Sequence, residues 1–528
     1  MGVIDTLTGN LTYLVLLILL IIYIPTYLYV RSSPKMKERG IITYGPCIMI
    51  KTKRGIPLLD KFAKYKRFWR VFGTISKVMA FFLIAMIVFI LIVDILLLPL
   101  MIESEGLGVQ YALAIPGLNP MLPLVYGIIG LIVALVVHEM AHGIQTRAND
   151  MKVDSMGLLH AVVPIGAFCE PNNEEINNCS RKARSSMYAA GIAVNLTLAL
   201  VLFLVMSMGL MGTMSSKVGD NAAVINVTAD SPAYYSGIGY SSVILEVGEV
   251  PSGEIVMGPV MMTYDDVMGY SYTPGVEYYI FYATKDGPAS LVKMYMGIFI
   301  DAVVPGSPAA LAGIPAKSFL VSINGHPIGN IQEFSEAMTL YSPGEPVSIG
   351  YATYSDPTNT IFVDVELGAR GDRAFLGVNY SLSGFSFTTP NTVLAAVKNP
   401  LKDAESITDG AMAALSYIGM PLRGYSPIPQ EIQWWYESSI MNDQTFWIVL
   451  QTVFWIFWLN LVLAVTNALP AVPFDGGYLL RDGVGSIIDR THRQATEEKR
   501  EQIVNSITRV VSYIMLFILM MVMIAILF

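Results

Sequence analysis

The sequence predicts a polytopic α-helical membrane protein of about six transmembrane helices, with a β-rich polar region inserted before the last two. The first observation is composition: 54% of the 528 residues are hydrophobic and 14% are charged, whereas soluble domains carry about 25% charged residues. The second is a set of apolar runs long enough to cross the roughly 30 Å hydrocarbon core of a bilayer. The third is an acidic stretch between residues 214 and 447, with 23 Asp/Glu against 9 Lys/Arg. This pattern excludes an ordinary soluble enzyme.

The predicted transmembrane helices are six apolar runs. They cover residues 12–30, 78–102, 121–142, 186–208, 446–468 and 510–528. The segment 31–70 holds 12 Lys/Arg against two acids, and basic residues also follow the third and fifth runs. Because cytoplasmic loops are enriched in Lys and Arg, these segments are expected inside the cell, and the N-terminus and the acidic stretch outside it. The first run lacks a basic N-terminal flank, so we expect a retained helix rather than a cleaved signal peptide.

The acidic stretch contains an internal repeat with a period of 76 residues. The pattern SPAxxxGI occurs at residues 231–238 and again at 307–314. In each copy the serine can cap a helix whose first turn holds the proline. The second copy continues with LVSINGHPI and resembles the PDZ domains of bacterial membrane proteases. This resemblance implies two extracytoplasmic β-rich PDZ-like domains, which either bind peptides at a sheet edge, exclude bulky substrates, or act only as spacers.

The motif His138-Glu139-Met140-Ala141-His142 ends the third apolar run. Two histidines four residues apart project from one face of a helix, so both imidazoles can bind one metal ion. This is the HExxH pattern of zinc proteases, in which the glutamate serves as general base. Burying these polar side chains in a bilayer is costly unless they are paired or coordinated. The sequence therefore predicts a zinc site within the membrane, nearer the cytoplasmic face.

Asp475 is the best candidate for a third protein ligand. It lies in the sequence NALPAVPFDGG at residues 467–477, directly after the fifth apolar run. Pro470 and Pro473 would break the helix there, and broken helices at membrane depth line a protein or water cavity. The alternative is an ordinary helix-ending loop with a solvated aspartate.

These motifs together resemble the site-2 protease family of intramembrane metalloproteases, whose GxxxN feature is present as Gly191-x3-Asn195. The resemblance implies one zinc ion held by His138, His142 and Asp475, with Glu139 as general base. It also implies that Asn195 and Asn467 bind the substrate backbone or stabilise the oxyanion. For both asparagines, a hydrogen bond between helices is the alternative. Phe474 departs from the family, in which leucine commonly precedes the aspartate.

We expect six regions along the chain. The membrane part comprises an N-terminal two-helix region with a basic cytoplasmic loop (1–110), the first half of the protease core (111–213) and its second half (446–528). Within the first half, residues 157–168 are expected to form a re-entrant strand or hairpin. Between the two halves we expect two PDZ-like domains (222–297 and 298–383) and an amphipathic connector (384–445).

The function implied by the resemblance is cleavage of transmembrane segments of membrane proteins, with the PDZ-like pair filtering substrates. The expected partners are therefore the lipid bilayer and membrane proteins with a transmembrane helix. No nucleic-acid partner is expected; the net charge of −8 is itself uninformative, because the charge is unevenly placed along the chain. Two alternatives are a catalytically silent scaffold that binds peptides through its PDZ-like domains and a metal transporter. The sequence does not fix the oligomeric state.

Overall fold

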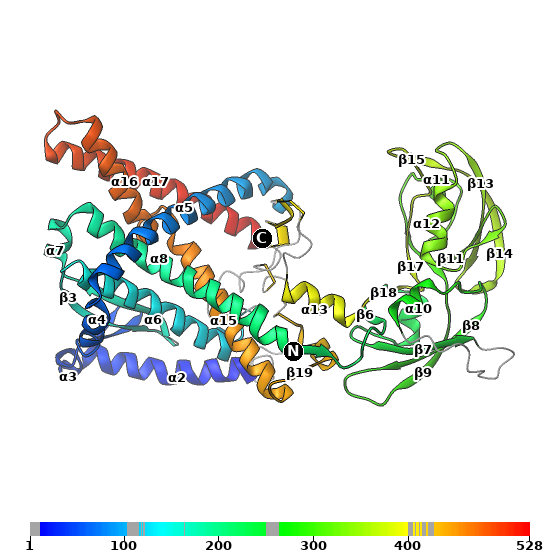
Figure 1. Cartoon of the computed structure of the whole chain (residues 1–528), viewed down its shortest axis with the longest axis horizontal. Helices are drawn as coiled ribbons and strands as arrows, with labels where there is room; N and C mark the ends of the chain where they lie inside the picture. Colours follow the sequence, from blue (N-terminus) through cyan, green and yellow to red (C-terminus); the bar gives the residue numbers. More distant parts are fainter. Residues whose placement is uncertain are drawn as a thin grey trace. The chain divides into compact units, whose positions relative to one another are not determined.

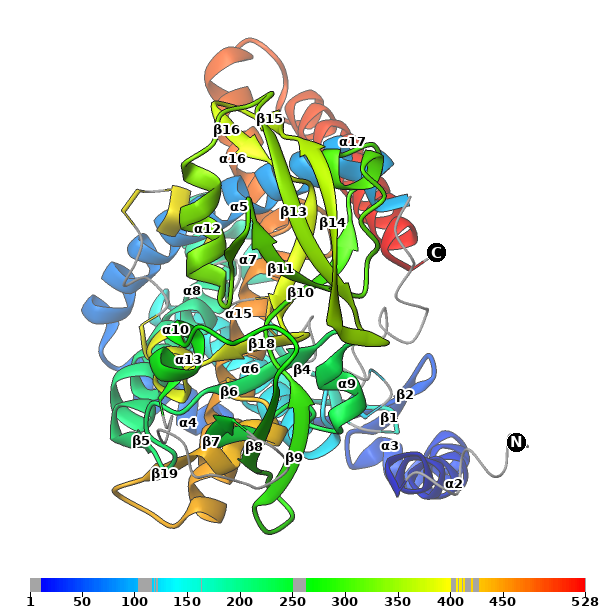
Figure 2. The ribbon, with the colours of Figure 1, turned by 90° about the vertical axis from the view of Figure 1, so that its right-hand side faces the viewer.

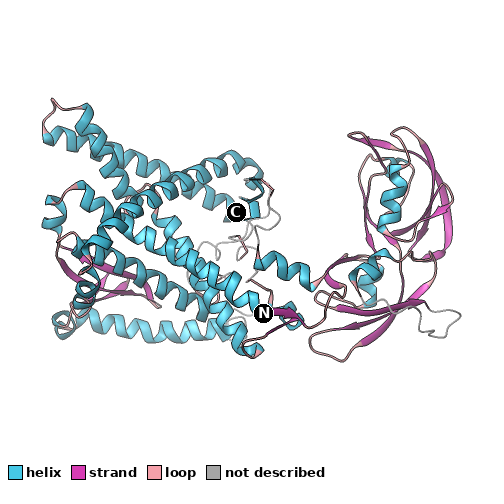
Figure 3. Cartoon of the chain, in the orientation of Figure 1, coloured by secondary structure: helices cyan, strands magenta, loops and turns pink. Residues whose placement is uncertain are grey.

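The computed structural model describes residues 11–102, 122–162, 164–249, 263–399 and 427–527, with short stretches at 116–117, 119, 405–406, 408–410, 412–413 and 419–420. The chain forms two compact units. The first comprises Met1–Leu210, Leu415–Pro427 and Gln444–Phe528, and the second Met211–Ala414 and Ile428–Asp443. Helices dominate the first unit and strands the second (Figures 1 and 3).

Long apolar helices form most of the first unit. Among the described residues, five are long and apolar enough to cross a membrane. They are α5 (Lys66–Ile102), α6 (Leu124–Ala148), α8 (Arg181–Leu204, continued by the π-helix η2, Val205–Leu210), α15 (Asp443–Asn467) and α17 (Glu497–Leu527). They coincide with five of the six predicted runs, so the chain is a membrane protein.

The remaining predicted run, 12–30, lies in α2 (Leu11–Ser32). Within this helix, Leu17–Ser32 forms an apolar helix that is shorter than the five membrane-spanning candidates. Residues 1–10, expected outside the cell, are not among the described residues.

The long helices differ in what they contact: α5 carries exposed apolar side chains, whereas α6 and α15 cross closely at a small residue. Phe81 and Leu96 of α5 are 73% and 72% exposed within the protein, which suits a helix that faces lipid. At Gly130 of α6, by contrast, an added Cβ would lie 2.8 Å from the carbonyl oxygen of Trp455 on α15. Small residues at such crossings let membrane helices approach closely.

A four-stranded antiparallel sheet also belongs to the first unit. Its order is β1-β2-β3-β4 (Ile41–Tyr44, Cys47–Thr52, Val153–His160, Pro164–Pro171). The predicted hairpin at 157–168 is confirmed as β3–β4. The segment 31–70 is not a simple loop, because it contributes β1, β2 and two short helices, α3 (Pro34–Glu38) and α4 (Ile56–Ala63).

Polar side-chain contacts also connect three strands of this sheet. Ser155 and Lys51 donate hydrogen bonds to the Glu170 carboxylate at 2.6 and 2.9 Å. These two donors hold the pKa of Glu170 below its usual range. The basic residues of the segment 31–70 therefore include one that joins β2 to β4.

The second unit is built on an eleven-stranded antiparallel sheet (Figure 2). The strand order is β14-β13-β11-β10-β17-β18-β6-β7-β8-β9, with β12 pairing with β11. In chain order the strands are β6 (Ala223–Val227), β7 (Val243–Glu249), β8 (Glu277–Ala283), β9 (Ser290–Tyr295), β10 (Ile298–Val303), β11 (Ser318–Ile323), β12 (His326–Pro327), β13 (Pro346–Thr353), β14 (Asp356–Glu366), β17 (Val378–Leu382) and β18 (Phe385–Thr388).

Two hydrophobic cores divide this sheet into two lobes. The first core packs beneath α9 (Pro232–Ser236) and α10 (Tyr264–Gly269), and the second beneath α11 (Pro308–Leu311) and α12 (Ile331–Thr339). The predicted helix caps are confirmed in both copies of the repeat. The Ser231 hydroxyl accepts a hydrogen bond from the Tyr234 amide, and the Ser307 hydroxyl from the Ala310 amide.

The lobes differ from the predicted boundaries in one respect. β18 lies in the segment 384–445 that was expected to be a connector, yet it pairs with β6 and completes the first lobe. Along the chain, the second lobe is thus inserted between β9 and β18. The rest of the connector includes α13 (Pro390–Lys398) and the 3-10 helix η6 (Gln430–Trp435), and much of 400–426 lies outside the described residues.

Two short strand pairs also lie in the second unit: β15 with β16 (Gly368–Arg370, Arg373–Phe375) and β5 with β19 (Met214–Ser216, Tyr436–Ser438). In the first unit, the six-residue helix α7 (Asn173–Asn178) precedes α8.

Candidate metal centre

His138 and His142 lie on the inner face of α6. Both are buried, with 4% and 8% of their surface exposed. Their Nε2 atoms are 3.1 Å apart, and the ring planes are nearly perpendicular at 84°. Because the two residues are four apart on a helix, both rings point to the same place.

Asp475 brings a third ligand atom to this place from a distant part of the chain. It begins α16 (Asp475–Thr491). Its Oδ2 lies 3.2 Å from Nε2 of His138 and 3.1 Å from Nε2 of His142. Ligand atoms about 2.0–2.1 Å from a tetrahedral zinc ion are about 3.3 Å from one another. The three atoms therefore fit one zinc ion.

The hydrogen bond of His142 leaves its other ring nitrogen free for a metal. Nδ1 of His142 is 2.8 Å from the carbonyl oxygen of Met187 on α8. A carbonyl only accepts hydrogen bonds, so this contact requires the proton on Nδ1 and an unprotonated Nε2. Such outer contacts orient metal-binding imidazoles.

Gly191 leaves the space that the two imidazoles fill. It lies on α8, one turn after Met187. A Cβ added there would lie 2.5 Å from Nε2 of His142 and 2.7 Å from Cε1 of His138. Any side chain at this position would displace the rings, so α8 closes one side of the centre only because this residue is glycine.

Glu139 lies beside the same centre. One carboxylate oxygen of Glu139 and one ring nitrogen of each histidine lie within 4.8 Å of one another. Its Oε2 accepts a hydrogen bond of 2.8 Å from the Cys169 amide on β4. The expected general base therefore also touches the backbone of the predicted hairpin.

The turn between α15 and α16 carries Asp475 to the histidines. Gly476 and Gly477 allow this turn to pack tightly against the start of α16. A Cβ at Gly476 would lie 2.3 Å from the carbonyl oxygen of Ala468, and one at Gly477 would lie 2.4 Å from the carbonyl carbon of Ala471. The two glycines of the DGG sequence are thus required by close approach of backbone.

Comparison with known proteins agrees with this geometry. The family model described as Peptidase family M50 matches residues 126–519, which include both halves of the centre. The chain belongs to Peptidase family M50, the site-2 protease family. Members of this family are zinc metalloproteases.

A curated protein of Methanocaldococcus jannaschii, described only as uncharacterized, is 32% identical over 184 residues. The match covers 34% of this chain and 47% of that protein, so the chain spans about half the length of this relative.

The asparagines expected to bind substrate in this M50 peptidase both make hydrogen bonds within the protein. Nδ2 of the fully buried Asn195 donates to the carbonyl oxygen of Ala134 on α6, at 3.3 Å. Nδ2 of Asn467 donates to Leu463 in its own helix, at 3.0 Å. The first contact is the hydrogen bond between helices that was the alternative expectation. Within the described part of the chain, Oδ1 of Asn195 is buried and has no hydrogen-bond partner.

Asn460 is a buried polar residue of α15 that the sequence reasoning missed. It is fully buried, and its Nδ2 donates to the Ile456 carbonyl at 2.7 Å. Its Oδ1, like that of Asn195, is buried without a partner among the described residues. Its position could have indicated it: Asn460 lies seven residues before Asn467 in an otherwise apolar run, so both lie on the same side of the helix.

Proposed function

We propose that this M50 peptidase is an intramembrane zinc metalloprotease that cleaves transmembrane segments of membrane proteins. The proposal rests on the convergence of His138, His142 and Asp475, whose ligand atoms lie 3.1–3.2 Å apart, with Glu139 beside them. Zinc bound by these residues supplies a Lewis acid that makes water a nucleophile near neutral pH.

Glu139 is the proton carrier in the proposed reaction. Its carboxylate takes a proton from the attacking water and later delivers that proton to the amine of the leaving group. The Cys169 amide holds one carboxylate oxygen, so the other can face the water. His138, His142 and Asp475 would hold the metal, and three protein ligands of this kind are the usual set of a catalytic zinc site.

The substrate helix must unwind before it is cut, because a helical segment keeps its carbonyls in internal hydrogen bonds. The hairpin β3–β4 offers a strand for the unwound segment, since β4 is an edge of its sheet and touches Glu139. We place this reaction nearer the cytoplasmic face, with the two lobes of the second unit acting outside the cell as a PDZ-like filter against bulky ectodomains. We also propose that Asn195 and Asn467 contact the substrate backbone; for Asn195 the support is its Oδ1, which has no hydrogen-bond partner among the described residues, while Nδ2 holds α8 to α6.

The test compares purified wild type with Glu139→Gln on a membrane-spanning substrate. We expect about one zinc ion per chain in both proteins, cleavage by the wild type only, and loss of cleavage when a chelator removes the metal. Glutamine keeps the size of the side chain but cannot take a proton. Cleavage by both proteins would remove Glu139 from its role, and wild type without zinc would refute the metal centre.

The same experiment tests the scaffold alternative. A catalytically silent scaffold would bind peptides without cleaving the substrate, whatever its zinc content. It would also have no use for four polar side chains gathered in one place, two of which, His138 and His142, are buried.

A further inference from the structure

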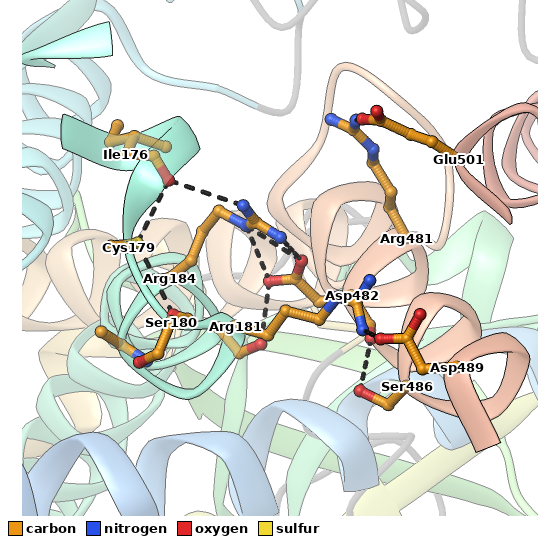
Figure 4. Close-up of polar contacts among 12 residues, drawn as sticks. Ile176, Cys179, Ser180, Arg181, Arg184, Arg481, Asp482, Ser486, Asp489 and Glu501 are labelled. Carbon is orange, nitrogen blue, oxygen red and sulfur yellow. Dashed lines mark hydrogen bonds and ion pairs between the residues drawn. The ribbon is translucent and has the colours of Figure 1, made fainter. Parts of the chain in front are cut away.

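α8 and α16 run side by side from the metal centre, and their contacts form a regular series. At the centre, Gly191 of α8 faces the imidazoles that Asp475 of α16 also contacts. The next contact is a ring stack of Tyr188 on Tyr478, with centroids 4.7 Å apart and planes 10° apart. Two ion pairs follow, and Figure 4 shows both.

The inner ion pair joins Arg184 of α8 to Asp482 of α16. Nε and Nη2 of Arg184 donate to Oδ1 of Asp482 at 2.9 and 2.5 Å, and Nε also lies 3.2 Å from Oδ2. The Ser185 hydroxyl donates to Oδ2 at 3.0 Å. Asp482 is only 3% exposed. A buried carboxylate held by a guanidinium fork and a hydroxyl is fixed in position.

Asp482 lies seven residues after Asp475 on the same helix. This distance is about two turns, or about 10.5 Å along the axis. A shift of α16 by one residue would move Asp482 by about 1.5 Å and turn it by about 100°, away from Arg184. Arg184 is itself held, because its Nη1 contacts the carbonyl oxygen of Ile176 in α7 (Figure 4). The pair therefore admits one register of α16 on α8.

We propose that Arg184 is a positioning residue for the third metal ligand. By holding Asp482, it sets the register of α16 and thereby keeps Oδ2 of Asp475 within reach of the zinc ion. This inference rests on the proposed function, because it assumes that Asp475 binds the metal.

The outer ion pair provides a matched control. Arg181 contacts Asp489, and both side chains are 39% exposed. Asp489 lies about two turns beyond Asp482 on α16, further from Asp475. It also contacts Arg500 of α17, at 3.3 Å. Loss of Arg181 therefore removes one charge from α8 and one ion pair between the same two helices, while leaving the inner pair in place.

The experiment measures zinc loss from purified full-length protein to an excess of chelator, together with the melting temperature. Arg184→Lys keeps the charge but loses the fork, and Asp482→Asn loses the charge. Direct partners of metal ligands contribute about 10- to 100-fold to affinity. Arg184 acts one step further from the metal, so both variants should lose zinc about tenfold faster than wild type. Arg181→Gln should stay within about twofold of wild type.

Two further variants separate positioning from general stability. Leu450→Ala, at a fully buried site on α15 distant in sequence from the turn that carries Asp475, should lower the melting temperature without faster zinc loss. The reversal R184D/D482R should recover much of the retention lost by either single variant. Zinc loss by Leu450→Ala as fast as by Arg184→Lys, or wild-type retention in Arg184→Lys, would overturn the inference. Wild type that holds no zinc would instead refute the proposed function.

Discussion

At the residue scale, the metal centre combines side chains that a local motif reveals with others that only the fold brings near. The HExxH spacing predicts the meeting of His138 and His142 because helical geometry alone places them on one face. The 3.1 Å approach of Asp475 to His142 is a tertiary contact, which no local spacing encodes. The sequence could suggest Asp475 only through its proline-rich surroundings and a family resemblance.

Gly191 gives a prediction at this scale. Gly191→Ala should lower zinc occupancy at least about tenfold, because the added Cβ would lie 2.5 Å from the ring nitrogen expected to bind the metal. Zinc content per chain after purification is the measurement. Gly209→Ala is the control in the same apolar segment, since no heavy atom lies within 4 Å of its Cβ position. Equal zinc in both variants would contradict this account of Gly191.

At the element scale, most long helices were predictable and the strands of the first unit were only partly so. A run of about 20 apolar residues is a strong signal for a membrane helix. β1 and β2 gave only a weak signal for strands, because basic residues flank their short apolar runs. The other pairing partner of β2, strand β3, lies about 100 residues later in the chain. The hairpin β3–β4 was found because its own two strands are adjacent in sequence.

The start of α16 allows a test of backbone packing within one helix. Gly476→Ala should destabilise the protein by about 1–3 kcal/mol, because its Cβ would collide with the carbonyl oxygen of Ala468 at 2.3 Å. Gly483→Ala has no heavy atom within 4 Å of the new Cβ, so it should stabilise the helix by up to about 1 kcal/mol. Thermal unfolding in detergent measures both. A lower melting temperature for Gly483→Ala than for Gly476→Ala would refute the packing argument.

At the scale of the whole molecule, the 76-residue repeat predicted two similar lobes but not how the chain joins them. The repeat ends before β18, whose four residues Phe385–Thr388 are too few to signal a strand by pattern. Its pairing with β6 is a contact across some 160 residues. The second lobe therefore has adjacent ends, because Ile298 and Leu382 are paired neighbours on β10 and β17.

This insertion permits a clean test of the proposed filter. Deleting 298–382 and joining Gly297 to Ser383 should leave the strands of the first lobe paired, because the excised ends already meet. If the lobes exclude bulky ectodomains, the shortened protein should cleave intact membrane substrates that the wild type cuts only after ectodomain removal. The control is a substrate without an ectodomain, which both proteins should cleave at similar rates. Unchanged selectivity would argue against a filtering role for the second lobe.

The position of β18 also constrains the order of events during synthesis. Strand β6 begins at Ala223, but the strand that pairs with its free side ends at Thr388. During synthesis, strands β6 to β9 of the first lobe are made first, but β18 is made only after the whole second lobe. The strands of the second lobe, β10 to β17, are made in one continuous stretch. The lobe that is translated first is therefore the one that completes its sheet last.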